Sequence, residues 1–418
     1  MTDSWRALRS RNFRLYAWGQ GVSLIGSWMS RLALSWLTWR LTHSALMLGL
    51  VGFSGQIFTF LLAPMAGVWV DRMDRRKLLV WTQVWSGLQS LALAVLTLLR
   101  VITIDEVLLL ASVQGFVDAF DMPARQSFVV KMVDRREDLP NAIALNSTLV
   151  QVARLIGPVV AGWIISISNE GWCFLVDAVS YVAVIVSLVM MRVPYERPTG
   201  ARPGMVEQMR EGWTYVRGFV PIRNILLLFA MSNLMGFSAM VLLPIFATTV
   251  LHGGAHTLGF LTGANGTGAM VAALLLARRK GVLGLEKRIQ WAAVVYGLGL
   301  LLFGASRVEW VSLLAMLAVG FGMMQTLASS NTVIQTLVPE SRRGRVMGYY
   351  TVAFVGMLPF GSLLVGALAH RIGAPHTLLV TGTGLLVAAA VFYTQRGVMG
   401  EQMRERYAEL GIGEAVTR

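Results

Sequence analysis

The chain has 418 residues, of which 55% are hydrophobic and 14% are charged, and its mean hydropathy is +0.62. A soluble domain carries roughly a quarter charged residues, so the composition excludes an ordinary soluble protein and indicates a multi-pass membrane protein. The net charge of +14 does not indicate nucleic-acid binding. The basic residues lie in short loops between apolar runs, where they set topology and contact anionic lipid headgroups.

The sequence contains no evident metal site or catalytic group. A single cysteine, Cys173, excludes an internal disulfide and a cysteine cluster, and the five histidines are scattered. No nucleophile is paired with a base, so we expect neither an enzyme nor a cofactor. The basic N-terminus leads into a long apolar run without a small-residue cleavage site, which predicts an uncleaved cytoplasmic tail.

Apolar runs of about twenty residues, the length that crosses a bilayer, recur along the chain. We predict an all-α polytopic membrane protein with twelve spanning helices, at about 13–38, 45–69, 78–99, 107–130, 141–166, 171–191, 225–250, 256–277, 289–305, 310–334, 346–369 and 375–394. With the N-terminus inside, the inner segments hold 30 of the 36 Lys and Arg residues. This asymmetry follows the positive-inside rule and predicts that both termini are cytoplasmic.

The stretch Gly67–Lys77 holds six charged residues in eleven, between two apolar runs. In lipid, charge this dense lies only at a helix end, so we predict a tight turn between two spanning helices. The stretch resembles the loop between helices 2 and 3 of the major facilitator superfamily. The residues that carry this resemblance are Gly67, Asp71, Arg72, Arg75 and Arg76, with Asp74 where a second glycine is usual. The alternative is a basic turn that only sets topology.

The longest connection, about 192–224, follows the sixth predicted helix. A shift of 204 residues places Gly157 and Gly162 on Gly361 and Gly366, which indicates an internal repeat. We therefore predict two pseudo-symmetric six-helix halves, at 1–191 and 225–396. A central loop at 192–224 joins them, and a cytoplasmic tail follows at 397–418. Near-helical spacing of apolar residues in the loop predicts an amphipathic helix on the inner membrane surface, with a solvated linker as the alternative.

Two charged residues are predicted near mid-membrane. Asp118 and Arg154 are equidistant from residue 136, the middle of the turn between helices 4 and 5, so an antiparallel hairpin places them at the same depth. A lone charge there is costly, so we expect an ion pair. This pair either faces the transport pathway, where Asp118 exchanges a proton as Arg154 approaches or withdraws, or only fixes the two helices.

The resemblance also implies a gating network at the cytoplasmic side. In the superfamily, an acid at the end of helix 4 pairs with a loop arginine, and the loop aspartate caps helix 11. Carried over, Asp121 meets Arg75, and Asp71 faces the helix that begins near 345–346. With Gly67, Arg72 and the nearby Arg125, these residues form the predicted gate; the alternative is a static anchor for the loop.

Helix 5 carries Gly157, Pro158 and Gly162, which resemble the glycine–proline motif of facilitator antiporters. Proline frees a carbonyl group and glycine permits close helix packing, so the motif predicts a bendable point and favours antiport. One departure weakens proton coupling through helix 4, because Ala111 stands where the superfamily often has arginine.

Polar residues inside the predicted spans are candidates for the substrate cavity. They are Gln20, Ser27, Arg31, Gln56, Gln114 and Asn146 in the first half, and Asn233, Gln325 and Asn331 in the second. Arg31 either pairs with Asp177 or extends to the headgroups. Helices 7–12 contain no acid, so the coupling group is expected in the first half. Methionines in the second half favour an amphiphilic cargo.

Residues 6–396 resemble the branch of the superfamily that includes the bacterial enterobactin exporter and related drug-efflux proteins. The segments that carry this resemblance include D-M-P-A-R-Q-S-F and P-E-S-R-R-G-R-V-M-G. It implies a monomeric secondary transporter of the cytoplasmic (inner) membrane that exports a drug or a siderophore-like molecule by proton antiport. Its partners are then a small-molecule substrate, protons and the lipid bilayer, with no nucleic acid. The alternatives are a uniporter or importer, and a membrane receptor that moves nothing.

Overall fold

The computed structural model describes residues 3–129, 131–192, 205–279 and 281–412. Within these ranges every regular element is helical and no strand occurs. The chain forms two compact units. The first comprises Met1–Thr199 and Val241–Gly266, and the second comprises Gly200–Met240 and Thr267–Arg418.

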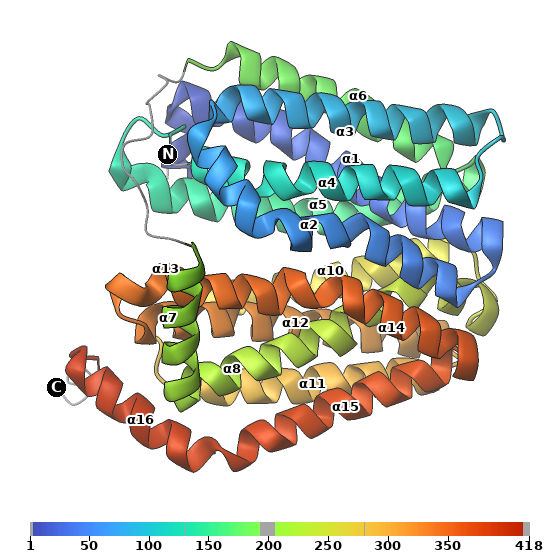
Figure 1. Ribbon diagram of the computed structural model, residues 1–418. Helices are drawn as coiled ribbons and strands as arrows, with labels where there is room; N and C mark the ends of the chain where they lie inside the picture. The colour runs from blue at the N-terminus through green and yellow to red at the C-terminus, as the bar shows by residue number, and fades with distance from the viewer. Residues whose placement is uncertain (1–2, 130, 193–204, 280, 413–418) are drawn as a thin grey trace. The chain divides into compact units, whose positions relative to one another are not determined.

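The first unit consists mainly of long helices that run alongside one another (Figure 1). Its elements are η1 (Asp3–Arg9), α1 (Arg11–Thr42), α2 (Ala45–Arg72), α3 (Arg75–Leu98), α4 (Ile104–Val129), η2 (Arg136–Asp138), α5 (Leu139–Ile167), α6 (Gly171–Met190), α9 (Leu243–Ile245), η5 (Phe246–Val250) and the first part of α10 (Ala255–Ala277). Helix α1 packs along α5 and α6, α3 along α4 and α6, and α2 along α4.

The second unit contains the remaining part of α10 and the helices that follow the central connection. Its other elements are α7 (Met205–Gly218), α8 (Val220–Met231), η3 (Ser232–Phe237), most of η4 (Ser238–Leu242), α11 (Leu285–Ala305), α12 (Glu309–Leu337), α13 (Glu340–Thr351), η6 (Val352–Gly356), α14 (Met357–Ile372), α15 (Ala374–Thr394) and α16 (Arg396–Glu409). The segments η3, η5 and η6 are π-helical. The division predicted from the repeat, at 191, 224 and 396, stays a prediction, because units defined by contacts do not test it.

Each of the twelve predicted spans falls on a helix or on a run of consecutive helical segments. In the described residues, eleven of these are long and apolar enough to cross a membrane. Helix α1 is the exception because it is richer in polar residues, although its 32 residues extend about 48 Å. The predicted all-α, multi-pass architecture is confirmed.

The turn between α2 and α3 is shorter than predicted, because α2 continues to Arg72 and α3 begins at Arg75. The Asp74 carboxylate accepts hydrogen bonds from the backbone N–H groups of Arg76 (3.0 Å) and Lys77 (3.2 Å). An aspartate at this position stabilises a helix by about 1 kcal/mol relative to alanine. Capping of α3 therefore accounts for an acid where the superfamily has a second glycine.

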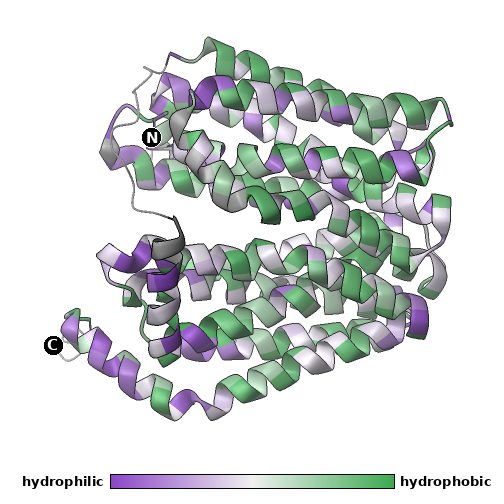
Figure 2. Ribbon diagram, viewed as in Figure 1, coloured by the Kyte–Doolittle hydropathy of each residue, from purple (hydrophilic) through white to green (hydrophobic). Residues whose placement is uncertain are grey.

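The first unit buries polar side chains and exposes large apolar ones. Ser23, Gln83 and Ser86 are almost completely buried, whereas Trp18 and Trp81 are 75% and 62% exposed. Figure 2 shows the long helices mainly green, with purple concentrated at turns and on α7 and α16. Because hydrocarbon offers no hydrogen bonds, polar groups turn inward and apolar groups face outward, as in a lipid-embedded bundle.

Repeat-related glycines make the same kind of contact in each unit. A Cβ added to Gly157 on α5 would lie 2.7 Å from the Cβ of Trp28 and 2.9 Å from the carbonyl oxygen of Ile25, both on α1. A Cβ added to Gly361 on α14 would likewise overlap Leu234 on η3. Small residues let helix backbones approach closely in membranes. This equivalence agrees with the predicted internal repeat.

A second glycine of α5 lies against the first part of α10. A Cβ added to Gly162 would lie 2.6 Å from the carbonyl oxygen of Ala255 and 3.0 Å from the Cα of Gly259. A Cβ added to Gly259 would lie 2.8 Å from the carbonyl oxygen of Pro158. The two backbones are therefore in direct contact, with no space for a side chain at either glycine.

The predicted amphipathic segment of the central loop is helical, as α7. Glu211 forms an ion pair with Arg345 on α13, and the rings of Trp213 and Tyr349 lie 5.8 Å apart. The helix is confirmed, whereas its contact with the membrane surface stays a prediction.

The predicted C-terminal tail contains helix α16, which packs onto the second unit. Its Met399, Met403 and Tyr407 are buried, and Arg406 Nε donates to the carbonyl oxygen of Leu337 (3.0 Å) at the end of α12. The segment is thus an integral part of the unit as far as residue 412.

Replacing Gly162 by leucine forces α5 and α10 apart, so we expect the free energy of unfolding to fall by about 1–3 kcal/mol. Thermal unfolding of the detergent-purified protein measures this loss. The matched control is Gly400→Leu on α16, since a Cβ there meets nothing within 4 Å. An equal melting temperature for Gly162→Leu and wild type would contradict the backbone contact.

Candidate functional site

Asp118 lies on the inner face of α4 and is half-buried. It accepts a hydrogen bond from Gln114 Nε2 (2.9 Å), which also lies 3.2 Å from Ser86 Oγ on α3. The direct partner of this carboxyl group in the described structure is therefore a neutral amide.

Asp121, one turn further along α4, is held by more partners. Its Oδ1 accepts from Thr82 Oγ1 and Gln83 Nε2, both at 2.7 Å, and its Oδ2 accepts from Arg125 Nε (2.9 Å) and Nη2 (2.7 Å). Arg125 Nη1 also donates to Gln20 Oε1 on α1. Charge-assisted hydrogen bonds of this kind are about twice as strong as neutral ones. They join α1, α3 and α4 around one partly buried ion pair.

A third acid, Asp177 on α6, is 2% exposed. It accepts hydrogen bonds from Ser90 Oγ on α3 (2.7 Å) and Ser27 Oγ on α1 (3.2 Å). The Ser27 hydroxyl also lies 3.4 Å from that of Tyr181. Asp177 therefore joins α1, α3 and α6 through neutral hydroxyl groups.

Two arginines lie against the indole ring of Trp28. The Cζ atoms of Arg31 and Arg154 are 5.0 Å and 5.6 Å from the ring centroid, within the range of cation–π attraction. Arg154 Nη2 also donates to Asn265 Oδ1 on α10 (2.8 Å). The contacts described here for Asp118 and Arg154 lead to other residues, so their predicted pairing stays a prediction.

The predicted gating residues are described only in part. The side chains of Asp71 and Arg72, and the surroundings of Gly67, lie outside the described residues. Arg75 is the first residue of α3, and the following Arg76 donates from Nε to the carbonyl oxygen of Leu188 on α6 (2.8 Å). The ion pair of Asp121 with Arg125 is the part of the predicted network that the structure brings together, and the pairing of Asp121 with Arg75 stays a prediction.

The remaining candidates of the first unit make local or inter-helix hydrogen bonds. Gln56 Nε2 donates to the carbonyl oxygen of Gly52 within α2 (3.1 Å). Asn146 Oδ1 on α5 accepts from the Tyr16 hydroxyl on α1 (3.2 Å). Asn146 thus contacts α1, the helix that carries Gln20 and Ser27. Gln56 contacts only its own helix, α2, through this hydrogen bond.

The three candidates of the second unit have separate surroundings. Asn233 lies in the π-helical η3 and donates to the carbonyl oxygen of Phe229 (2.7 Å). Gln325 Nε2 donates to Ser329 Oγ (3.4 Å), and its buried Oε1 has no hydrogen-bond partner in the described structure.

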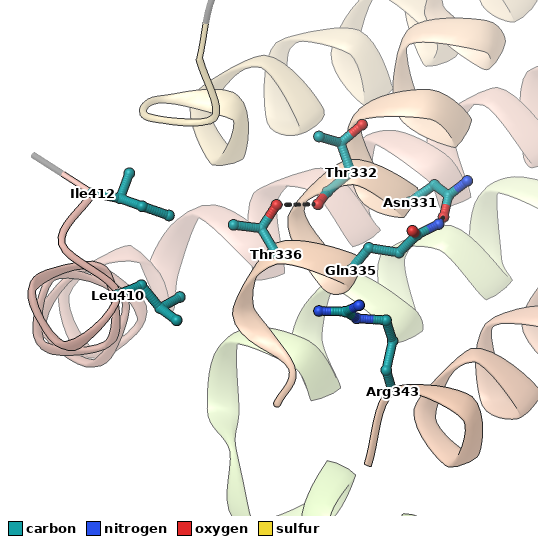
Figure 3. Close-up of a pocket in the computed structure, with 7 residues that line it drawn as sticks. All are labelled: Asn331, Thr332, Gln335, Thr336, Arg343, Leu410 and Ile412. Atoms are coloured by element: carbon teal, nitrogen blue, oxygen red, sulfur yellow. Dashed lines mark hydrogen bonds between the residues drawn. The ribbon is translucent and has the colours of Figure 1, made fainter. Parts of the chain in front are cut away.

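Asn331 lines a pocket of about 520 Å³ (Figure 3). It accepts from Gln335 Nε2 (2.7 Å) on the same face of α12, across from Arg343 of α13. Leu410 and Ile412 form the apolar side of this pocket.

Sequence reasoning missed the polar face of α3 and the role of Trp28. The missed residues of α3 are Thr82, Gln83, Ser86, Gln89 and Ser90. Their helical spacing was a usable signal, because five polar residues on one face of a spanning helix indicate a polar interior. Trp28 had no signal, since an indole in a membrane helix faces lipid as readily as it faces arginine.

Among the described residues, no group of three or more His, Cys, Asp or Glu could hold a metal ion. The polar interior of the first unit is thus built of acids, arginines, amides and hydroxyls. Such groups exchange protons and bind polar parts of organic molecules.

The family model described as "Transmembrane secretion effector" matches residues 2–408. The chain is 25% identical to the staphyloferrin A transporter of Staphylococcus aureus, over 88% of this chain and 92% of the relative. It is 22% identical to macrolide efflux protein A of Streptococcus pyogenes (89% and 93%). It is 26% identical to the enterobactin exporter EntS of Escherichia coli (83% and 82%).

A solved structure supports the fold independently. The inward-facing, occupied structure of a bacterial homologue of the human lysosomal transporter Spinster matches with a TM-score of 0.72 at 12% identity, over 96% of this chain and 99% of that chain. The match confirms the predicted fold, and the relatives confirm the predicted siderophore and drug-efflux branch. The chain belongs to the transmembrane secretion effector family of the major facilitator superfamily.

Proposed function

We propose that the protein exports a small amphiphilic organic molecule across the inner membrane by alternating access, driven by proton antiport, with both termini in the cytoplasm. Membership of a transporter family supports transport as such. The names of two relatives, an enterobactin exporter and a macrolide efflux protein, support the outward direction. The three relatives together favour a siderophore-like molecule or a drug as cargo.

The observation that carries the proposal is the unequal pairing of three acids. Asp121 has the cation Arg125, and Asp177 has two hydroxyl donors, whereas Asp118 has the single amide of Gln114. An unpaired charge inside a membrane is costly and marks proton or substrate pathways. Protonation of Asp118 breaks no ion pair and affects one hydrogen bond, whereas Asp177 accepts two, so Asp118 is the proposed proton-exchanging group.

Arg154 is the proposed moving partner of Asp118. It donates to Asn265 in this structure, so pairing with Asp118 requires that the hydrogen bond to Asn265 break first. Two alternative partners of one arginine give two discrete arrangements, which is what alternating access needs. Loss of the proton from Asp118 favours the arrangement in which Arg154 approaches it.

The coupling proposal predicts that the detergent-purified wild-type protein releases protons when enterobactin or a macrolide is added. Asp118→Asn removes the exchanging group and keeps the shape, so we expect ligand binding without proton release. Asp105→Asn is the matched control, because Asp105 is an exposed carboxylate at the other end of α4. Proton release is measured with a pH indicator in weakly buffered solution.

Two results would contradict this proposal in different ways. Proton release that persists in Asp118→Asn would move the coupling site elsewhere. Ligand binding without proton release in the wild type would favour a uniporter and would make Asp118 a structural residue.

We also propose that the ion pair of Asp121 with Arg125 is part of the predicted cytoplasmic gate. Asp121→Asn leaves Arg125 without its counter-charge, so we expect the free energy of unfolding to fall by about 2 kcal/mol. This loss is smaller than for a fully buried ion pair, because both side chains are partly exposed. We also expect the rate of transport per folded molecule in proteoliposomes to change. Reduced stability with an unchanged rate would instead identify the pair as a static anchor.

A further inference from the structure

The first unit contains a cavity away from the acid cluster of Asp118, Asp121 and Asp177. The cavity lies at the opposite end from the turn between α2 and α3. Its volume is about 620 Å³, within the range of small-molecule sites. The end of α1, the α3–α4 turn, the α5–α6 turn and the start of α10 all contribute to it. Its charged lining side chains are those of Arg40, Arg100 and Glu170, and His256 also lines it.

The side chains that line this cavity carry a net positive charge. Glu170 is 2% exposed and accepts from Arg40 Nε (2.7 Å) and Nη2 (2.5 Å), so these two charges compensate one another. Arg100 is exposed, and no hydrogen bond or ion pair engages its guanidinium in the part of the chain that the structure describes. The cavity therefore offers one uncompensated guanidinium beside a closed ion pair.

Two further groups favour a negative ligand. The first turn of α10, with Ala255 and His256, lines the cavity and contains no acid, so the positive end of the helix dipole is uncompensated. Thr97 also lines the cavity; it is 3% exposed, and its hydroxyl oxygen has no hydrogen-bond partner in the described structure. A buried hydroxyl without a partner is costly unless a ligand satisfies it.

Part of the remaining wall is apolar, beside the polar residues Ser166, Ser168 and Asn169. Trp36, Leu41, Ile102 and Ile165 line it, and the two isoleucines are buried. A small inorganic anion would leave this surface without contacts. An oxyanion attached to an aromatic or aliphatic body would satisfy both parts of the wall.

We propose that this cavity is a binding site for an organic carboxylate, with the carboxylate at Arg100 and Thr97 and the apolar body against Trp36 and Ile165. The site is separate from the acid cluster, and its existence does not depend on the proposed export. An anionic lipid headgroup shares the oxyanion chemistry, so the experiment must distinguish a soluble ligand from a lipid.

The probe is a fluorinated naphthoate, whose binding to the full-length protein in neutral detergent is followed by fluorine NMR line broadening. We expect saturable binding, and no competition from the corresponding neutral naphthamide. Arg100→Asn is the main variant, because asparagine tolerates the left-handed backbone of Arg100 (φ 60°) and should not impair folding. We expect binding to weaken about tenfold in this variant, and about threefold in Thr97→Val.

The matched control is Arg371→Gln, an exposed arginine in the last turn of α14, which should bind the probe like the wild type. No binding to the wild type, equal competition by the naphthamide, or unchanged binding to Arg100→Asn would each overturn the proposal. Displacement by short-chain phosphatidylglycerol but not by phosphatidylcholine would show that a lipid headgroup occupies the site and would overturn the carboxylate, whereas displacement by neither supports a soluble carboxylate. Because no transport is measured, failure here leaves the proton-release experiment to judge export separately.

Discussion

The lack of hydrogen-bonding partners in hydrocarbon is the constraint on which the rest of this structure depends. A polar side chain in a spanning helix is therefore stabilised by a partner inside the bundle. In the first unit this requirement gathers Asp118, Asp121 and Asp177 on inward faces, where α1, α3 and α4 supply amides and hydroxyls. The same requirement turns tryptophans such as Trp81 outward. The polar interior is thus a consequence of placing this sequence in lipid.

Several features could be predicted from the sequence because they depend on local composition. Twenty-residue apolar runs locate the helices, and charge locates the turns. An acid and a base four residues apart on one helix face, such as Asp121 and Arg125, are in reach of each other wherever the helix packs. Glycines at equivalent repeat positions, such as Gly157 and Gly361, likewise indicate close packing before any neighbour is known.

Other features depend on which helices become neighbours, and sequence spacing does not contain that information. Asp118 and Arg154 are equidistant from the turn between α4 and α5, but equal depth does not decide which helices surround each side chain, so their pairing stays a prediction. In the structure α4 packs mainly on α2 and α3, whereas α5 packs on α1. Trp28 of α1 is therefore the contact of Arg154, and Ser86 of α3 approaches the amide that holds Asp118. The π-helical turn at Asn233 was missed for a related reason, since one extra residue in a turn leaves an apolar run unchanged.

The first unit contains two kinds of helix contact, hydrogen bonds to carboxylates and a backbone contact between glycines. They differ in the free energy that separating or sliding the helices would cost. Helices α1, α3, α4 and α6 are joined by hydrogen bonds to buried carboxylates, and separating them would expose unpaired charge to an apolar interior. Between α5 and the first part of α10, Gly162 meets Gly259 backbone to backbone, and the one side-chain hydrogen bond described across that contact joins Arg154 to Asn265. Sliding along a glycine contact changes van der Waals packing gradually and leaves no buried charge without a partner, provided that Arg154 finds a new acceptor. The carboxyl group of Asp118, which has no cation of its own in hydrogen-bonding contact, is an acceptor of that kind. A movement of α5 and the protonation state of Asp118 would then be linked through a single arginine.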